Sequence, residues 1–311
     1  MDIASMERFE ANRNRLASLA YRLLGSAADA EDAVQDTFLR WHAADREHIE
    51  VPEAWLTKVL TNLSLDRLRS ATMRRERAVG DWLPEPLLDG DPMLGPADAV
   101  EQRESVTLAV LTLMERVPPV ERAVYVLREA FSHTHAEIAG ILDITESASQ
   151  QYAHRARRRI AAERVVGEID LAAARRIVEA FVDAASSGRT ERLVALLTDD
   201  ATAISDGAGQ AGKLLRYSVP ERVAAALRAG FKPTRAKRKL VGGPLAMHAG
   251  VVNGSPAVIA AIEDRVVGVV VLDVRDDKVA VVRGMAGPGR LARLAEEWQR
   301  REHDDSLLTS W

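Results

Sequence analysis

The stretch PVERAVYVLREAFSHTHAEIAGILDITESASQQYAHRARRRI, residues 119–160, decides the architecture of the first half of the chain. Thr134 and Glu137 have the spacing of a capping box, in which each side chain accepts a hydrogen bond from the other residue's backbone, and they predict a helix start. A turn follows, and Thr145 is the expected N-cap of the next helix. Apolar residues at helical spacing predict an earlier helix over 119–131. They are Val120, Val124 and Leu127.

The last helix of this stretch has an apolar side and a polar-to-basic side. Ala148, Tyr152 and Ala156 recur every four residues and are expected to face the core. The other side carries short hydrogen-bonding side chains first, which suit base edges, and arginines last, which suit phosphates. These arginines are Arg155, Arg157, Arg158 and Arg159. A DNA-binding helix-turn-helix is one interpretation, and a solvated basic helix on a bundle surface is the alternative.

Composition limits the class of protein. The 311 residues allow two or three domains, and a hydrophobic content of 47% supports proper cores. The formal net charge is -4, so basic residues that bind DNA should be confined to local surfaces. The acidic residues should then belong to a surface that meets a second partner or to a domain that does not bind DNA. Cysteine is absent, which excludes disulfides and thiolate metal sites. Without a signal pattern or a long apolar run, we expect a soluble, cytoplasmic protein.

Two further helices carry contrasting charge. The segment SAADAEDAVQDTFLRW, residues 26–41, is crowded with acid on one side. Acid in its first turn favours the helix dipole, but Gln35 and Asp36 lie beyond the reach of that effect. An exposed acidic face here is expected to meet a basic protein partner. The segment WLTKVLTNLSLDRLR, residues 55–69, is followed by more arginines and predicts a second basic surface.

These segments together resemble a known family. Residues 26–41 and 55–69 look like region 2 of bacterial extracytoplasmic-function (ECF) sigma factors of the sigma-70 family. The helix-turn-helix, which ends in HRAR at residues 154–157, looks like their region 4. Order and spacing match over roughly the first half of the chain. The resemblance implies a promoter-specificity subunit that initiates transcription and needs neither catalysis nor a cofactor.

The resemblance also implies a role for individual residues. Docking on the clamp coiled coil of the RNA polymerase β′ subunit falls to Asp29, Asp32, Gln35 and Asp36. Binding of the -10 element, with a flipped base in a pocket formed partly by the loop 42–51, falls to Asn62, Asp66, Arg67, Arg69 and Arg74. Recognition of the -35 element falls to Ser147, Gln150, Gln151, His154, Arg155 and Arg158. Arg155 borders the apolar side, so a structural role is its alternative. Region 4 is also expected to contact the polymerase β flap.

The second half predicts an α+β domain. Helices are expected at 171–185, 191–197 and 219–230, with one strand at 201–205. From residue 240 the pattern changes to strands at 245–252, 257–263, 266–274 and 278–283. This order is typical of the SnoaL-like, nuclear-transport-factor-like cone, and the apolar strand 266–272 should be central to its sheet. The cone could enclose a small-molecule ligand.

The linker WLPEPL, residues 82–87, is too apolar to be free and resembles a motif of the ECF subfamily with a fused SnoaL-like domain. A staple onto the adjacent bundle is the alternative. The subfamily's Asp-Gly-Gly-Gly-Lys motif has only the longer counterpart DGAGQAGK at 206–213, for which a flexible loop is the alternative. The implied interdomain regulatory residues are Trp82, Leu83, Pro84, Glu85, Pro86, Leu87, Asp206, Gly207 and Lys213.

The expected fold is therefore multidomain, with two all-α domains followed by an α+β cone. We expect region 2 at 1–75, the linker at 76–104, region 4 at 105–165, the SnoaL-like domain at 168–290, and a C-terminal helix and tail at 291–311. Within it, residues 303–311 are expected to be mobile. The C-terminal domain is expected to regulate the sigma factor in cis.

Two other functions compete with this interpretation. An operator-binding regulator would explain the helix-turn-helix but neither the acidic face nor the second basic surface. An enzyme of the SnoaL-like class would use a pocket acid or base, for which His248, Asp206 and Asp264 are candidates. Structural roles explain each of the three better, and no paired acid and base is evident.

Overall fold

The computed structural model describes residues 3–75, 82–95, 105–161, 171–207, 214–232, 234–235, 238–239 and 242–308. Tertiary contacts divide the chain into two compact units. The first comprises Met1–Glu85 and Gly90–Arg164, and the second comprises Pro86–Asp89 and Val165–Trp311. Part of the predicted linker therefore belongs to the second unit, and the chain returns to the first unit after it.

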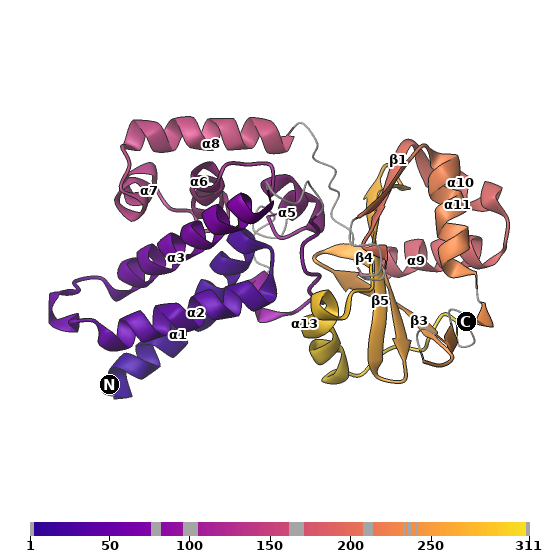
Figure 1. Ribbon diagram of the computed structural model, residues 1–311, viewed down its shortest axis with the longest axis horizontal. Coiled ribbons are helices and arrows are strands. Elements are labelled where there is room, and N and C mark those ends of the chain that lie inside the picture. The colour runs from indigo at the N-terminus through magenta and orange to yellow at the C-terminus, as the bar shows by residue number, and fades with distance from the viewer. Residues whose placement is uncertain are drawn as a thin grey trace. The chain divides into compact units, whose positions relative to one another are not determined.

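The first unit is helical (Figure 1). Its elements are α1 (Ile3–Leu24), α2 (Ala27–Ala43), η1 (Arg46–His48), α3 (Pro52–Arg75), η2 (Pro92–Leu94), α5 (Leu108–Met114), α6 (Pro119–Glu129), α7 (His135–Leu142) and α8 (Glu146–Ala161). Helix α1 packs on both α2 and α3. Their shared core includes Phe9, Leu16, Trp41, Leu56 and Leu60, each at most 1% exposed.

The helix-turn-helix consists of α7 and α8 packed on α6. The capping box of Thr134 and Glu137 is present, and Thr145 Oγ1 accepts from the amide of Ala148 at 3.1 Å. Asp143 ends α7 in the left-handed conformation, with φ 54° and ψ 47°, which Asp tolerates better than most residues.

The buried side of α8 differs from the predicted one. It consists of Ser149, Ala153, Ala156 and Ile160, whereas Ala148 and Tyr152 are only half-buried. Ser149 could not be recognised as buried from the pattern. Its hydroxyl lies 2.9 Å from His135 Nδ1, and this hydrogen bond offsets the cost of burying a polar group.

The second unit is an α+β domain, as predicted. Its elements are α9 (Leu171–Ser186), α10 (Thr190–Leu196), β1 (Leu197–Ser205), β2 (Leu215–Ser218), α11 (Pro220–Phe231), β3 (Ala246–Val252), β4 (Ser255–Ile262), β5 (Arg265–Arg275), β6 (Lys278–Met285) and α13 (Pro288–Gln299). The strand order is β2-β1-β6-β5-β4-β3. Only the β1–β6 pair is parallel, and β5 is central, as its apolar run predicted.

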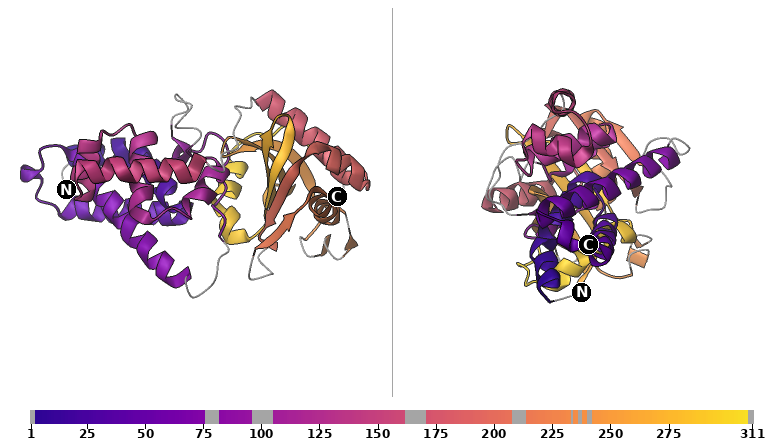
Figure 2. Two further views of the ribbon diagram at one scale, coloured as in Figure 1. Left: turned by 90° about the horizontal axis from the view of Figure 1, so that it is seen from above. Right: turned by 90° about the vertical axis from the view of Figure 1, so that its left-hand side faces the viewer.

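Helices cover both faces of this sheet (Figures 1 and 2). Helices α9 and α11 pack on one face, where Val178, Phe181, Val223 and Leu272 form part of the main core. Helix α13 lies on the opposite face, against β5. No helix among the described residues is long and apolar enough to cross a membrane.

The prediction of a mobile tail was wrong for residues 303–308. His303 stacks on Trp298, with ring centroids 3.4 Å apart. Leu307 donates from its backbone to Met247 at 2.7 Å, and Met247 donates to Leu308 at 2.9 Å. The tail thereby covers the open edge of β3, an interaction that the polar sequence before Leu307 did not indicate.

Candidate nucleic-acid and polymerase interfaces

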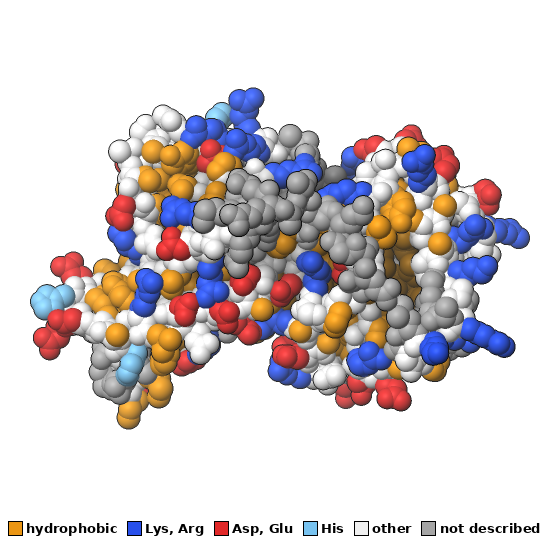
Figure 3. All heavy atoms as spheres, viewed as in Figure 1, with side chains coloured by type: hydrophobic (Ala, Val, Ile, Leu, Met, Phe, Trp, Pro, Cys, Tyr) orange, Lys and Arg blue, Asp and Glu red, His pale blue; other side chains and the backbone are white. Residues whose placement is uncertain are grey.

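The polar side of α8 is open to solvent within the described part of the chain. All six side chains predicted to recognise the -35 element are exposed. They are Ser147, Gln150, Gln151, His154, Arg155 and Arg158. Figure 3 shows Lys and Arg side chains gathered over α8. A helix held from one side by α6 and α7 can present its other side to a DNA groove.

Ion pairs to α6 hold three of the four arginines of α8. Arg157 lies 2.6 Å from Glu129, and Arg155 lies 3.0 Å from Glu121, which also pairs with Arg159. Arg155 in addition lies over the ring of Tyr152, at 4.8 Å from its centroid. These contacts support the structural alternative for Arg155. Arg158 has no ion-pair partner within the described part of the chain.

The acidic face of α2 meets one predicted DNA-binding residue. Arg67 of α3 lies 2.7 Å from Asp36, 3.7 Å from Asp32 and 4.0 Å from Asp29. The three carboxylates are 45% to 66% exposed, while Arg67 is 30% exposed. Gln35 is also exposed. The sequence assigned these residues to two separate interfaces, but the structure joins them in one charge cluster.

The remaining predicted -10 residues are spread along α3. Asn62 is half-buried, and the exposed Asp66 pairs with Arg69 at 3.1 Å. The side chain of Arg74 lies outside the described part. The loop between α2 and α3 lines a shallow, open hollow of about 520 Å³, whose lining includes Asp45, His48, Ile49, Glu50 and Trp55. This volume is sufficient for a single base.

Residues 82–85 of the linker motif dock on the first unit. Glu85 accepts from Ser26 Oγ and from the backbone amide of Ala27, both at 2.8 Å, so it occupies the N-terminus of α2. Tyr21 donates to the carbonyl of Glu85 at 2.7 Å. Gly25 has φ +65°, and a Cβ there would lie 2.2 Å from the Trp82 ring, so this position requires glycine.

Residues 86–89 belong to the second unit. Leu87 donates to Asn253 Oδ1 at 2.8 Å and accepts from the amide of Asn253 at 3.0 Å. Asp89 donates from its backbone to Val251 at 3.0 Å. Leu83 and Leu87 are fully buried, and Pro84 and Pro86 are buried as well. The motif is therefore anchored on both sides of the bond between Glu85 and Pro86.

The other predicted regulatory segment, residues 206–213, is held at Asp206 by hydrogen bonds within the second unit. The carboxylate of Asp206 accepts from the amides of Ala286 at 3.0 Å and Gly287 at 2.9 Å, where α13 begins. Gly207 follows it, and Lys213 lies outside the described residues. His248 contacts the Trp298 ring at 5.2 Å and lies 3.1 Å from the carbonyl of Asp304. The contacts of Asp206 and His248 thus agree with structural roles.

Helix α7 packs against α3, and α6 packs against both α1 and α3, within the first unit. Lys58 of α3 donates to the Gly140 carbonyl and to Asp143, both at 2.9 Å, at the turn between α7 and α8. Arg122 of α6 donates to the carbonyl of Leu23 at 2.8 Å. Nη2 of Arg15 lies 3.2 Å from Nε2 of His133. The two predicted DNA-binding modules thus form one compact body.

Sequence reasoning did not single out four positions that stand out in the structure. Leu39 is 55% exposed on α2, and its place among the polar residues of that helix was the only sequence signal for this exposure. Asn253 lies between two predicted strands, and nothing in the sequence there indicates its hydrogen bonds to Leu87. Asp273 and Arg283 form a buried ion pair between β5 and β6, and no pattern in these strands predicts that pairing.

Two family models match the chain. Sigma-70 region 2 matches residues 8–74, and sigma-70 region 4 matches residues 107–160. With the exposed recognition helix, they define the class of protein: this is an RNA polymerase sigma factor, a subunit that recognises promoters.

Relatives give the family. The chain is 40% identical over 213 residues to ECF RNA polymerase sigma factor SigJ of Mycobacterium tuberculosis, covering 68% of each chain. It is 33% identical over 304 residues to the probable ECF RNA polymerase sigma factor SigI of the same species, covering 93% of this chain and 95% of SigI. The crystal structure of SigJ superposes with a TM-score of 0.69 and 30% identity, over 93% of this chain and 98% of that one. The chain belongs to the ECF sigma factors, and its second unit has the α+β fold that was expected of a SnoaL-like C-terminal domain.

Proposed function

We propose that each exposed surface of this sigma factor serves the interface that the sequence assigns to it. The acidic face of α2 docks on the β′ clamp coiled coil, α3 and the loop hollow bind the -10 element, and α8 recognises the -35 element. Region 4 also contacts the β flap. The observation that carries this proposal is the exposure of all six predicted -35 residues on α8, beside a buried side that packs on α6. Affinity then comes from phosphates, and specificity from base edges.

We further propose that the C-terminal domain regulates the sigma factor in cis through residues 82–89. Glu85 caps the helix whose acidic face meets the polymerase. Directly after it, Leu87 and Asp89 bond to the tip of the hairpin formed by β3 and β4. A change in the second unit can therefore pull on the N-terminus of α2. The domain has no catalytic role in this proposal, although its cone could bind a small molecule, and the protein acts in the cytoplasm.

The first unit also has the properties of a closed form. The two promoter elements lie roughly 25 base pairs apart, or about 85 Å of DNA at about 3.4 Å per pair. A compact body of roughly 160 residues is only about 40 Å across. Both DNA-binding surfaces lie in one such body. We propose that region 4 separates from region 2 when the protein engages a promoter.

Promoter-directed transcription in vitro tests the regulatory proposal. Core polymerase would be combined with the full chain, with a chain ending near Gly167, and with Glu85→Gln. If the domain restrains α2 through Glu85, truncation and Glu85→Gln should change transcription in the same direction. Asp89→Asn, whose exposed side chain leaves the backbone bonds intact, is the matched control. Equal transcription from the full and truncated chains would refute regulation in cis.

A further inference from the structure

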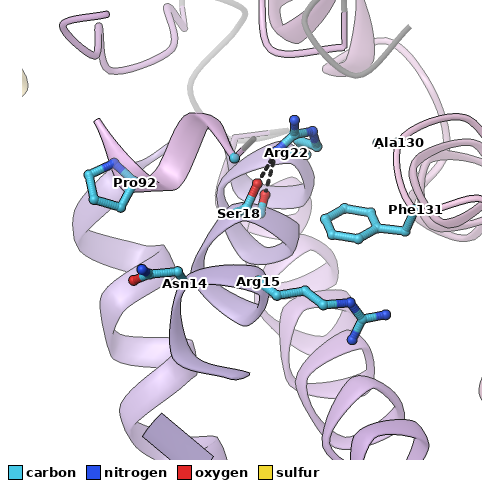
Figure 4. Close-up of a pocket in the computed structure, with 8 residues that line it drawn as sticks. Asn14, Arg15, Ser18, Arg22, Pro92, Ala130 and Phe131 are labelled. Carbon is cyan, nitrogen blue, oxygen red and sulfur yellow. Dashed lines mark hydrogen bonds between the residues drawn. The ribbon is translucent and has the colours of Figure 1, made fainter. Parts of the chain in front are cut away.

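A hollow between α1, η2 and the end of α6 has no role in the interfaces described above. Its volume is about 430 Å³, within the range of sites for small molecules. Its lining includes Asn14, Arg15, Ser18 and Arg22 from one side of α1, together with Gly95 and Phe131. Figure 4 shows Phe131 projecting between Arg15 and Arg22. The site thus joins region 2, the linker and region 4.

Two guanidinium groups converge on the ring of Phe131. The Cζ atom of Arg15 lies 5.6 Å from the ring centroid, and that of Arg22 lies 5.5 Å from it. Cation–π contacts at this distance hold both groups in place along the same hollow. Further hydrogen bonds fix both arginines in these positions.

Arg22 is a buried cation, only 2% exposed. It donates to Ser105 Oγ at 2.9 Å, to the carbonyl of Leu94 at 2.9 Å and to Ser18. Burial lowers the pKa of Arg22 to about 10, since the charged form is poorly solvated there. An anion beside this group would restore part of the lost solvation.

Arg15 has donors that its own contacts do not use. It donates from Nη1 to Thr57 Oγ1 at 3.0 Å, and its Nη2 lies 3.2 Å from His133. Within the described part of the chain these are its only polar contacts, and they use two of the five N–H groups of a guanidinium. Burial lowers the pKa of Arg15, while the charge of Glu53 acts in the opposite sense.

We propose that this hollow binds a small molecule that carries a phosphate group, of a size between pyrophosphate and a nucleoside diphosphate. The planar guanidinium of Arg15, which has donors left, matches phosphate oxygens with paired hydrogen bonds, while Arg22 contributes only its charge. Asn14 and Ser18 add neutral polar groups on the same side of α1. A DNA duplex is too wide to enter a hollow of about 430 Å³. The ligand is therefore a free small molecule and not a promoter phosphate.

The ligand would stabilise the closed form of the first unit. It contacts α1 and the segment at Phe131 at the same time, and these separate when region 4 leaves region 2. Any ligand that binds only the closed form shifts the equilibrium toward it. This regulatory consequence rests on the proposed function, whereas the binding itself does not.

Calorimetric titration of the full chain with pyrophosphate and with ADP tests the site. We expect saturable binding of one equivalent of at least one probe, with a higher melting temperature. Arg15→Gln should weaken binding at least about tenfold, because it removes a charge-assisted contact. Arg13→Gln is the matched control, since Arg13 is exposed on the same helix and pairs with Glu10.

A second variant separates loss of the site from loss of the fold. Asn14 is exposed, so Asn14→Asp should fold normally and still weaken binding through charge repulsion. Absence of saturable binding to the parent protein, or unchanged binding in both Arg15→Gln and Asn14→Asp, would overturn the proposal. If a probe binds as expected but leaves promoter-directed transcription unchanged, the site stands and its link to the closed form is overturned.

Discussion

Single residues on α2 differ in how freely they can meet a partner. Gln35 is exposed, whereas Asp36 is held by Arg67 at 2.7 Å. Gln35→Arg should weaken binding to core polymerase by about tenfold or more, because a desolvated like charge in an interface costs several kcal/mol. It should leave the melting temperature unchanged. Asp36→Arg should lower both, since it places a cation beside Arg67.

Binding to core polymerase and thermal melting of each variant would check this prediction. Glu7→Arg, an exposed change on α1, is the control for added positive charge. If Gln35→Arg bound polymerase as well as the parent did, the acidic face of α2 would not be the docking surface.

We expect His133 to make the stability of the first unit sensitive to pH. Burial lowers its pKa, the charge of Arg15 lowers it further, and Glu137 opposes both. The unfolded chain, with a histidine pKa of about 6.5, then binds more protons than the folded one. Stability from this site is complete above about pH 6.5 and is lost as the pH falls below it.

We therefore expect the melting temperature to fall from about pH 7.5 to about pH 5.5, and His133→Gln to reduce that fall. The exposed His42, changed to Gln, should leave the fall as it is in the parent. The pKa of His303 is also lowered by burial, so part of the pH dependence should remain in His133→Gln. An identical pH dependence in His133→Gln and parent would contradict the assignment.

At the scale of elements, α8 carries three arginines that pair with α6 and one, Arg158, that has no ion-pair partner among the described residues. Arg158→Ala should reduce holoenzyme affinity for a promoter fragment and lower the dependence on salt by about one phosphate contact. Arg157→Ala should have a smaller effect, because Arg157 already pairs with Glu129 at 2.6 Å. Binding at several salt concentrations measures both. A larger loss in Arg157→Ala would reverse this assignment of the phosphate-binding arginines.

The starts of helices could be predicted from the sequence where a few neighbouring residues specify them. Thr134 and Thr145 cap their helices as their spacing predicted, because capping involves only a few neighbouring residues. The buried side of α8 and the ordered tail after His303 could not be predicted, because each depends on a partner outside its own segment. Ser149 is buried because its hydroxyl bonds to His135, and Leu307 is ordered by backbone hydrogen bonds to the edge strand β3.

At the scale of the whole molecule, the closed first unit makes a mechanical prediction. Cysteine is absent, so Lys58→Cys with Asp143→Cys would introduce the only two thiols. Joining them with a short bis-maleimide should leave the docking of α2 on core polymerase in place and abolish promoter-directed transcription, because region 4 could no longer reach the -35 element. Each single variant, treated alike, is the control. Full transcription from the cross-linked protein would refute the closed form as an inactive state.

The sequence by itself determined the family, the order of the domains, the capped helices and the exposed face of α8. These follow from short-range patterns, in which spacing along the chain fixes which side chains share a face. Only the tertiary structure decided that Arg67 joins the acidic cluster and that Arg15 and Arg22 meet at Phe131. It also decided that Glu85 caps α2 while Leu87 bonds to Asn253. Such contacts join residues tens to hundreds of positions apart, and no local periodicity specifies which of the many exposed or apolar groups will meet.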